Sequence, residues 1–253
     1  MYWKKQPSPS APSTAEVSPV KECIFQILEN RPVSNRVHLL CLSGDTSAIT
    51  APGQFLSLSL PGKFLRRPFS VCDWDDGWVS LLVECVGTGT ELLQMMPVGA
   101  ELSVLTGLGN GFTMNHSITS PLLIGGGTGL SPLVGLAKRL SSAGISPDIL
   151  LGFRNRDDCF GADLFPGLNV RICDDVFDVL PHIHHDMFYA CGSEALMLEL
   201  CRRDSADGQV AFDVRMGCGF GVCMGCSRKT RSGMKRVCKD GPVFQKGELI
   251  WED

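Results

Sequence analysis

The sequence lacks an excess of basic residues, a long apolar run and an apolar N-terminal segment. Its 253 residues hold 23 Lys and Arg against 27 Asp and Glu, so no general basic surface exists for a nucleic-acid backbone. The longest apolar runs, at 81–83 and 121–124, are far below the roughly 18 residues that a membrane span needs. Since no apolar segment follows MYWKKQPSPS, no signal peptide is predicted, and the expected compartment is the cytoplasm.

Length and composition indicate a folded protein of one to three domains, because a domain holds about 150 residues. The hydrophobic content of 44% and charged content of 20% exclude fibrous, collagen-like and wholly disordered classes. The 12 cysteines would stay reduced in a cytoplasmic protein, as packing residues, metal ligands or redox groups. Four of them gather between residues 218 and 238, as a metal or iron-sulfur site requires.

The chain before residue 118 has the pattern of a tail followed by short strands. Residues 1–18 are rich in Pro, Ser, Thr and Ala and are predicted to be a flexible tail. Segments of alternating polarity, separated by Gly and Pro, lie at 23–28, 37–42, 54–60, 78–85 and 101–105. At least five short strands at this spacing predict a small antiparallel barrel, and ELLQMM at 91–96 predicts one helix within it.

After residue 118 the pattern changes to strand, glycine turn and helix. Leu133, Leu136, Ala137 and Leu140 recur at helical spacing, and Gly144 stands where a helix C-cap is expected. Strands are predicted at 121–124, 148–153, 169–173 and 187–191, and a second helix at 195–203. This alternation predicts a parallel sheet in a nucleotide-binding type of α/β domain, and the Gly- and Cys-rich last 40 or so residues predict a third unit.

Four cysteines form the most specific motif in the chain. Cys218-x4-Cys223-x2-Cys226-x11-Cys238 has the C-x4-C-x2-C…C spacing of plant-type 2Fe-2S ligation. Glycines between the ligands let the backbone bend tightly and aim N–H groups at the sulfurs. The alternative is a structural zinc, but zinc ribbons usually pair two short C-x2-4-C knuckles, and here only one C-x2-C exists.

A glycine run at 125–132, GGGTGLSP, follows a predicted strand and opens a predicted helix, so its N–H groups can face a phosphate. Gly125 and Gly127 match the dinucleotide fingerprint, but Leu130 occupies the position of its third glycine. Arg154 and Arg156 stand where an acidic ribose ligand is expected, which favours a 2′-phosphate. The alternative for the run is a plain tight turn.

RRPFS at 66–70, taken alone, indicates a turn with a solvated arginine. A flavin or phosphate site is the alternative. It gains support from GTGTELL at 87–93, which places Gly89 and Thr90 at the start of a short helix, where an anion is favoured.

Two further groups have plain packing or surface interpretations. Cys191 ends a predicted strand at the edge of the sheet where ligands bind, although a buried packing cysteine is the alternative. His182, His184 and His185 lie beside Pro181 with no other ligand set nearby, so a solvated turn is predicted there and not a metal site.

Together, RPFS in a barrel, GGGTGLSPL and YACGS in an α/β unit and the cysteine motif resemble the ferredoxin-NADP reductase superfamily. Within it, MGCGFGVCMGC…VCKDGPVF is most similar to the electron-transfer (iron-sulfur flavoprotein) subunits of NAD-dependent, class 1B dihydroorotate dehydrogenases, over residues 20–250. The implied fold class is multidomain, β plus α/β, with a small cluster domain. The implied divisions are a tail at 1–18, an antiparallel FAD-binding β-barrel at 19–117, a parallel-sheet NAD-binding α/β domain at 118–210 and a C-terminal 2Fe-2S cluster domain at 211–253.

The resemblance also implies the cofactor contacts. Arg67 is expected to pair with the FAD pyrophosphate and Ser70 to lie near the flavin ring. Glu84 departs from the basic or neutral residue expected there, so its side chain is expected to point away. The other implied FAD contacts are Pro68, Phe69, Val83, Cys85, Gly89 and Thr90. The implied NAD contacts are Gly125, Gly127, Thr128, Gly129, Cys191 and Gly192, and the implied cluster ligands are Cys218, Cys223, Cys226 and Cys238.

No Ser/His/Asp or paired-carboxylate constellation stands out, so the expected role is to position redox centres. A nicotinamide exchanges electron pairs, a 2Fe-2S cluster single electrons, and a flavin both. The resemblance implies an FMN-containing catalytic subunit that oxidises dihydroorotate in pyrimidine biosynthesis, with electrons passing from FMN through the cluster and FAD to NAD+. It also implies a heterotetramer of two of each subunit, and NAD in preference to NADP.

The surface around the cluster loops is expected to contact that partner through Phe220, Val222 and Met224, with packing beneath the cluster as the alternative. Two other functions stay open: a reductase subunit that serves a hydrogenase or a glutamate synthase, and a non-enzymatic zinc-binding interaction module.

Overall fold

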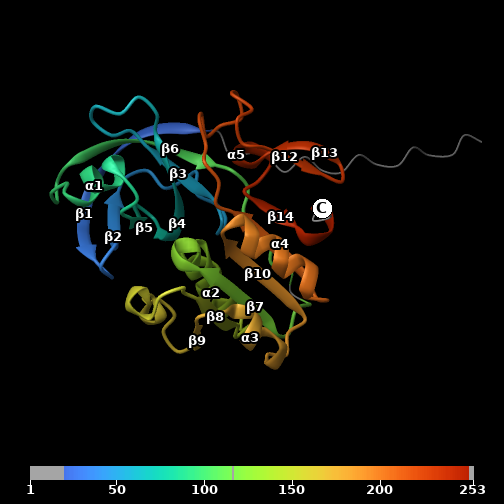
Figure 1. The fold of residues 1–253 in the computed structure, drawn as a ribbon. Helices are drawn as coiled ribbons and strands as arrows, with labels where there is room; N and C mark the ends of the chain where they lie inside the picture. Colours follow the sequence, from blue (N-terminus) through green and yellow to red (C-terminus); the bar gives the residue numbers. More distant parts are fainter. Residues whose placement is uncertain (1–19, 116, 251–253) are drawn as a thin grey trace, which may run out of the picture.

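A computed structural model describes residues 20–115 and 117–250, so the tail predicted at 1–18 lies outside the described residues. Within that part of the chain, no helix combines the length and the apolar character needed to cross a membrane. Figure 1 shows a barrel formed by the first part of the chain, a mixed sheet formed by the second, and a C-terminal segment beside both.

The barrel is closed by six antiparallel strands in the order β1-β2-β5-β4-β3-β6. The strands are β1 (Lys21–Pro32), β2 (Val37–Ser43), β3 (Phe55–Leu58), β4 (Arg67–Asp75), β5 (Trp78–Glu84) and β6 (Glu101–Leu108). Their inward side chains, among them Phe25, Leu40, Leu56 and Leu81, form one buried core, as period-two strands require. One short helix, α1 (Thr88–Gln94), follows β5 and begins three residues earlier than the predicted 91–96.

Strand β4 differs from the turn that RRPFS suggests on its own. Pro68 has no N–H to donate, yet it pairs in register with Ser57 near the start of the strand, a position where proline is tolerated. The strand continues through Val71 and Trp74, which are both buried. The proline and the two arginines therefore mark the beginning of a barrel strand.

The second sheet has the order β14-β11-β10-β7-β8-β9, parallel except for β14. Its strands are β7 (Pro121–Gly126), β8 (Asp148–Gly152), β9 (Asn169–Cys173), β10 (Met187–Gly192), β11 (Asp207–Phe212) and β14 (Val243–Gln245). Helix α2 (Ser131–Ser142) packs on one face, and α3 (Val176–Val179) and α4 (Glu194–Arg203) pack on the other. Cover on both faces explains the nearly continuous apolar runs of these strands.

Helix α2 also joins the sheet to the barrel, because it packs against β4 (Figure 1). Gly135 permits this approach: a Cβ there would lie 3.0 Å from the carbonyl oxygen of Cys72. Around it, Ser131 Oγ donates to the Ser70 carbonyl at 3.2 Å, and Lys138 pairs with Asp73 at 3.0 Å. The strand that carries RPFS and the helix that follows the glycine run are therefore held together.

The C-terminal segment adds the hairpin β12 (Ser227–Thr230) and β13 (Gly233–Arg236), then α5 (Val237–Asp240), before β14 returns to the sheet. The start of β14 is held by Asn110, whose side chain donates to the Val243 carbonyl at 2.8 Å and accepts from its N–H at 2.9 Å. The fold class expected from the sequence is confirmed. The boundaries at 118 and 211 stay predictions; β11 runs across the second of them.

Candidate functional site

The four cysteines of the C-terminal motif lie in two pairs. Cys218 Sγ accepts hydrogen bonds from the N–H of Val222 at 3.2 Å and of Cys223 at 3.4 Å, and also interacts with the Cys223 thiol. Cys226 Sγ accepts from the N–H of Cys238 at 3.4 Å, and these two thiols interact as well. The motif is therefore folded as Cys218 with Cys223 and Cys226 with Cys238.

The two pairs differ in electrostatics. Burial acts to raise the pKa of Cys218, but hydrogen bonds from the backbone N–H groups of Cys223, Phe220 and Val222 outweigh it and lower the pKa to about 6. In the other pair, burial and then the neighbouring Cys226 thiol raise the pKa of Cys238. Cys218 is thus favoured as a thiolate ligand, whereas burial at Cys238 favours a neutral or metal-bound sulfur.

The donor set of this segment is four cysteine thiols. The two thiol pairs supply the four sulfurs that a 2Fe-2S cluster needs.

The loop between the first two cysteines is shaped by glycines and braced by Arg236. Gly219 and Gly221 have φ values of +81° and +90°, which favour glycine. Arg236 donates to the Gly221 carbonyl at 3.0 Å while its own N–H is held by Asp240 at 2.8 Å. Arg236 therefore ties the cluster loop to helix α5.

The cluster loop lies on barrel strand β3. A Cβ placed on Gly219 would be 3.7 Å from Ser57 Oγ and 3.9 Å from the Phe55 ring. Ser57 pairs with Pro68 of β4, and paired strands lie about 4.8 Å apart. The cysteine loop and the RPFS strand are thus separated by one strand spacing.

Two adjacent arginines at the start of β4 have opposite environments. Arg66 is paired with Glu22 at 2.5 Å and donates to the Ser103 carbonyl at 2.9 Å, so it is part of the barrel. Arg67 Nη1 donates to the Leu65 carbonyl at 2.6 Å, and no carboxylate in the described part of the chain pairs with it. If Gly89 carried a Cβ, that atom would lie 3.1 Å from Arg67 Nε. The Arg67 guanidinium therefore faces the start of α1.

The loop before α1 is closed by Thr90. Thr90 Oγ1 accepts from the N–H groups of Val86 at 2.9 Å and Gly87 at 3.2 Å, and donates to the Gly87 carbonyl. Its hydroxyl therefore shapes the loop. Lys63, which the sequence reasoning missed, donates to Thr88 Oγ1 at 2.7 Å and brings a second cation to this end of α1. The run KFLRR at 63–67 was the signal for it.

The other predicted flavin residues lie on β4 and at the end of β5. Pro68, Phe69 and Ser70 are partly exposed on β4. The Val83 side chain is buried in the barrel core, so only its backbone is available for a ligand. Arg36 Nη2 lies 3.7 Å from Glu84 Oε1 and donates to the Cys85 carbonyl at 3.2 Å.

A cleft of about 880 Å³ opens between the barrel and the carboxyl ends of the parallel strands. Gly126, Gly127 and Thr128 line it from β7 and the 3-10 turn η1 (Gly127–Leu130), while Arg36 and Glu84 line it from the barrel. Its other walls come from the segments after β8, β9 and β10. Ligands of open α/β sheets bind at this edge.

The other residues predicted to contact NAD are closely packed beneath the cleft. They are Gly125, Gly129, Cys191 and Gly192. A Cβ on Gly129 would clash with the Cys191 carbonyl oxygen, and one on Gly125 would be 3.0 Å from Leu130. Burial raises the pKa of the Cys191 thiol, which is therefore neutral. A Cβ on Gly192 would be 3.2 Å from Leu196. Gly129 is therefore required to be glycine so that the turn can approach β10, while Gly125 and Gly192 are tightly packed.

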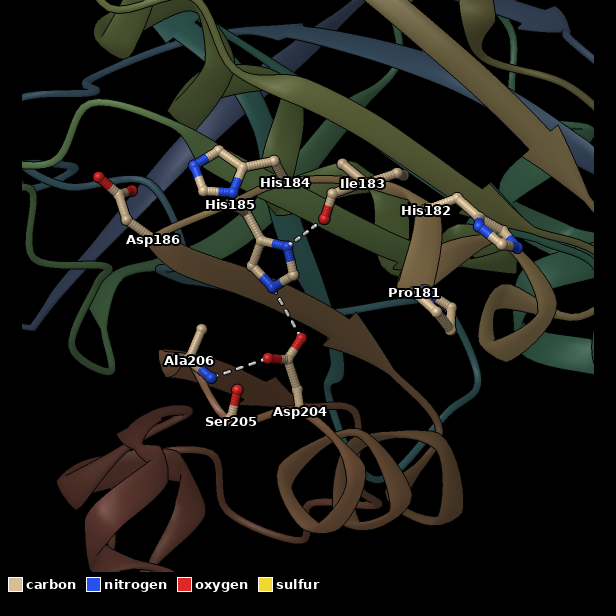
Figure 2. A pocket seen from close by; sticks show the side chains of 9 residues that line it. All are labelled: Pro181, His182, Ile183, His184, His185, Asp186, Asp204, Ser205 and Ala206. Atoms are coloured by element: carbon tan, nitrogen blue, oxygen red, sulfur yellow. Dashed lines mark hydrogen bonds and ion pairs between the residues drawn. The ribbon is translucent and has the colours of Figure 1, made fainter.

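The histidine group differs in part from the predicted solvated turn (Figure 2). His182 and His184 are exposed, but His185 is 9% exposed, with Nε2 2.7 Å from Asp204 Oδ2 and Nδ1 2.9 Å from the Ile183 carbonyl. Because both partners are acceptors, both ring nitrogens carry protons, and the Asp204 hydrogen bond raises the His185 pKa despite burial. The cavity of about 550 Å³ beside the pair lies where β10 and β11 begin, at the opposite edge of the sheet from the cleft.

Comparison with known proteins gives consistent matches. Residues 213–250 match the family model of the iron-sulfur cluster binding domain of dihydroorotate dehydrogenase B. The dihydroorotate dehydrogenase B (NAD(+)) electron transfer subunit of Clostridium perfringens (strain 13 / Type A) is 35% identical over 208 residues, which cover 76% of this chain and 84% of that protein. The corresponding subunit of Geobacillus sp. (strain WCH70) is 33% identical over 256 residues, which cover 91% and 99%.

Solved structures agree on the fold. A structure of the NADH-dependent reduced ferredoxin-NADP oxidoreductase is 25% identical, with a TM-score of 0.78 over 90% of each chain. The flavohem-like FAD/NAD binding domain of nitric oxide dioxygenase from Vibrio cholerae O1 biovar El Tor is 17% identical, with a TM-score of 0.60 over 76% of this chain and 99% of that one. The second likeness concerns the fold alone.

Proposed function

Because the chain belongs to the family of dihydroorotate dehydrogenase B (NAD(+)) electron transfer subunits, we propose that it is an oxidoreductase subunit of pyrimidine biosynthesis. It carries electrons between an FMN-containing dihydroorotate dehydrogenase catalytic subunit and NAD+. Its cofactors are a 2Fe-2S cluster, FAD and NAD. Bound FAD supplies the exchange between the electron pairs of a nicotinamide and the single electrons of the cluster.

The observation that carries this proposal is the contact of the cluster loop with the barrel. Gly219 lies against Ser57, and Ser57 pairs with Pro68 of the strand proposed to hold FAD. On the other side of that strand, Ser131 of α2 donates to the Ser70 carbonyl, and α2 follows the glycine turn of the cleft. The proposed sites for the cluster, FAD and NAD therefore follow one another across β3, β4 and α2.

The residues proposed for each site act through position and charge. Cys218, Cys223, Cys226 and Cys238 would hold the two irons. Arg67 and the backbone of the loop before α1 would hold the FAD pyrophosphate, with Lys63 as a second cation. Gly127 and Thr128 would face the NAD pyrophosphate in the cleft.

The partner subunit is proposed to dock on the cluster loop, in a heterotetramer of two subunits of each kind. Phe220, Val222 and Met224 are 44%, 72% and 54% exposed, which favours the contact interpretation over packing beneath the cluster. An electron-transfer subunit needs such a surface, since electrons reach the cluster only from a protein that lies close to it. Apolar side chains at this position support that contact.

Reconstitution tests the proposal. The purified chain is expected to reduce artificial dyes with NADH, and to support dihydroorotate-dependent NAD+ reduction only after the FMN-containing subunit is added. Dihydroorotate-dependent NAD+ reduction by this chain alone would contradict the division of labour. If the FMN subunit fails to restore it while dye reduction persists, the function moves to another reductase complex, one with a hydrogenase or a glutamate synthase.

A matched pair of variants tests the docking surface. Val222→Ser is expected to raise the concentration of the catalytic subunit needed for half-maximal activity by about tenfold, because burying a valine side chain contributes about 1.5–3 kcal/mol. Val98→Ser, at another exposed valine, 64% exposed in the turn before β6, is the control and is expected to change nothing. Equal effects of the two substitutions would move the docking surface elsewhere.

A further inference from the structure

An ion pair between Arg236 and Asp240 lies at the start of α5, within the cysteine segment. Arg236 Nε is 3.2 Å from Asp240 Oδ2, and Arg236 Nη2 is 3.4 Å from Asp240 Oδ1. Asp240 Oδ2 also accepts from the backbone N–H of Arg236 at 2.8 Å. Both side chains are 26% exposed, so the two charges are held in a fixed arrangement that is partly shielded from water.

The ion pair contacts the cluster loop and lies beside the buried cysteine pair. Arg236 Nη1 donates to the Gly221 carbonyl at 3.0 Å. The N–H of the same glycine interacts with the Cys238 thiol, and the Arg236 charge acts on both the Cys226 and the Cys238 sulfurs. A single residue, Gly221, therefore separates the guanidinium from a sulfur that is proposed to bind iron.

A charge at this position affects how easily a 2Fe-2S cluster is reduced. Reduction adds one electron, and thus one negative charge, to the irons and their sulfurs. A nearby cation stabilises this reduced form and a nearby anion opposes it, so the net charge and the hydrogen bonds around a cluster set its reduction potential. Arg236 and Asp240 carry opposite charges at nearly the same place, so the loss of one leaves the other uncompensated.

We propose that Arg236 and Asp240 are positioning residues that set the reduction potential of the cluster as a balanced pair, in which Arg236 raises the potential and Asp240 lowers it. The proposal rests on the proposed function, in which this segment holds a 2Fe-2S cluster. A pair that only braced the loop would change the amount of cluster retained, and the loss of either member would act in the same direction. Two opposite charges that tune the potential act in opposite directions.

Two lysines belong to the same surroundings. Lys235 acts on the Asp240 carboxylate, and the Lys239 side chain lies against Gly221. Both lysines stay in place in every variant described below, so the comparison isolates the two charges of the ion pair.

Redox titration of the full, cofactor-loaded chain tests the proposal, with dithionite as the reductant and the electron paramagnetic resonance signal of the reduced cluster as the readout. Arg236→Gln should lower the midpoint potential, so that the ratio of reduced to oxidised cluster at the wild-type midpoint falls about three- to tenfold. Asp240→Asn should raise that ratio by a similar factor. The double variant, which removes both charges, should return close to the wild type.

Two further variants serve as controls. Arg236→Lys keeps the positive charge and should keep the wild-type potential. Arg203→Gln removes the arginine of another ion pair between residues four apart, with Glu199 on α4, and should change nothing. Iron and acid-labile sulfide per chain show that each variant carries its cluster.

The direction of the shifts decides the outcome. Midpoint potentials that shift in the same direction in Arg236→Gln and Asp240→Asn, or in neither, would overturn the proposal. If Arg236→Gln loses its iron, Asp240→Asn is compared with Arg236→Lys, and a potential in Asp240→Asn that is no higher would overturn the proposal as well. A wild-type chain that holds neither iron nor sulfide after anaerobic reconstitution would instead refute the proposed function.

Discussion

The cluster segment and the flavin region are built in opposite ways. All four cysteines lie between residues 218 and 238, in one segment whose hairpin and short helix keep them together. The proposed flavin region combines Lys63 and Arg67 with the loop before α1, and these meet only because the barrel closes. One site is local in the chain, and the other depends on tertiary structure.

This difference predicts different responses to substitution. A cluster needs every one of its ligands, so the loss of a single sulfur removes the whole group. A pyrophosphate site shares its charge among several donors, so the loss of one weakens binding by that donor's contribution. The cluster segment should therefore fail completely and the flavin region by degrees.

The largest effect is expected for Cys226→Ser, which should abolish the cluster. The Cys226 and Cys238 pair would lose a sulfur, while the barrel, a separate closed sheet whose β3 contacts the cluster loop, should still bind FAD. Iron, acid-labile sulfide and flavin per chain are the measurements. Cys159→Ser, at a cysteine outside the motif, is the control. Unaltered iron and sulfide in every single Cys→Ser variant of the four would refute the ligand assignment.

The local site was also the easier one to predict from the sequence. Cysteine spacing alone identified the cluster motif, because its ligands need only a short segment to come together. The sequence left β4 open to a turn interpretation, because Arg67 and Pro68 resemble turn residues until β3 pairs with them. The acids after β9 had no local motif that points to a ligand, and Lys63 was signalled only by the basic run KFLRR at 63–67.

The structure also corrects an expectation about exposure. His185 was predicted to be solvated, but Asp204, 19 residues later in the chain, removes it from water. No local pattern contains that pairing, because the partner comes from another loop.

An intermediate effect is expected for Arg67→Ala, which should weaken FAD binding about tenfold or more. Charge-assisted hydrogen bonds to a phosphate are worth roughly 1.5–3 kcal/mol each, and Lys63 would remain to hold the anion. Titration of the flavin-free chain with FAD measures this. Unchanged affinity would leave RPFS as a barrel strand without a flavin role.

The neighbouring arginine supplies the contrast within the same region. Arg66→Ala should leave FAD affinity nearly unchanged and lower the free energy of unfolding by about 1 kcal/mol, because Arg66 donates to the Ser103 carbonyl and to Glu22 inside the barrel wall. Urea unfolding measures that loss. If Arg66→Ala weakened FAD binding as much as Arg67→Ala, the two arginines would not have separate roles.

The smallest effect on electron transfer is expected at the opposite edge of the sheet from the cleft, where His185 and Asp204 affect stability alone. The Asp204 hydrogen bond raises the His185 pKa, although burial opposes it and Asp186 adds to it. Burial acts to raise the pKa of Asp204. Hydrogen bonds from His185 and from the Ala206 N–H, together with the charge of nearby Lys246, outweigh burial and lower this pKa. The contribution of this ion pair to stability is therefore fully present between about pH 3.8, the unfolded pKa of Asp, and about pH 6.5, the unfolded pKa of His.

His185→Gln should leave NADH oxidation unchanged and lower the free energy of unfolding by about 1.5 kcal/mol near pH 6, the loss of one charge-assisted hydrogen bond. Since the His185 pKa is raised on folding, the wild type should lose this advantage as pH rises through the folded pKa, and the two proteins should converge. Urea unfolding between pH 6 and 9 measures the difference. His184→Gln, at the exposed neighbour, is the control and should follow the wild type at every pH. A difference that grows with pH would mean that His185 is neutral in the folded chain.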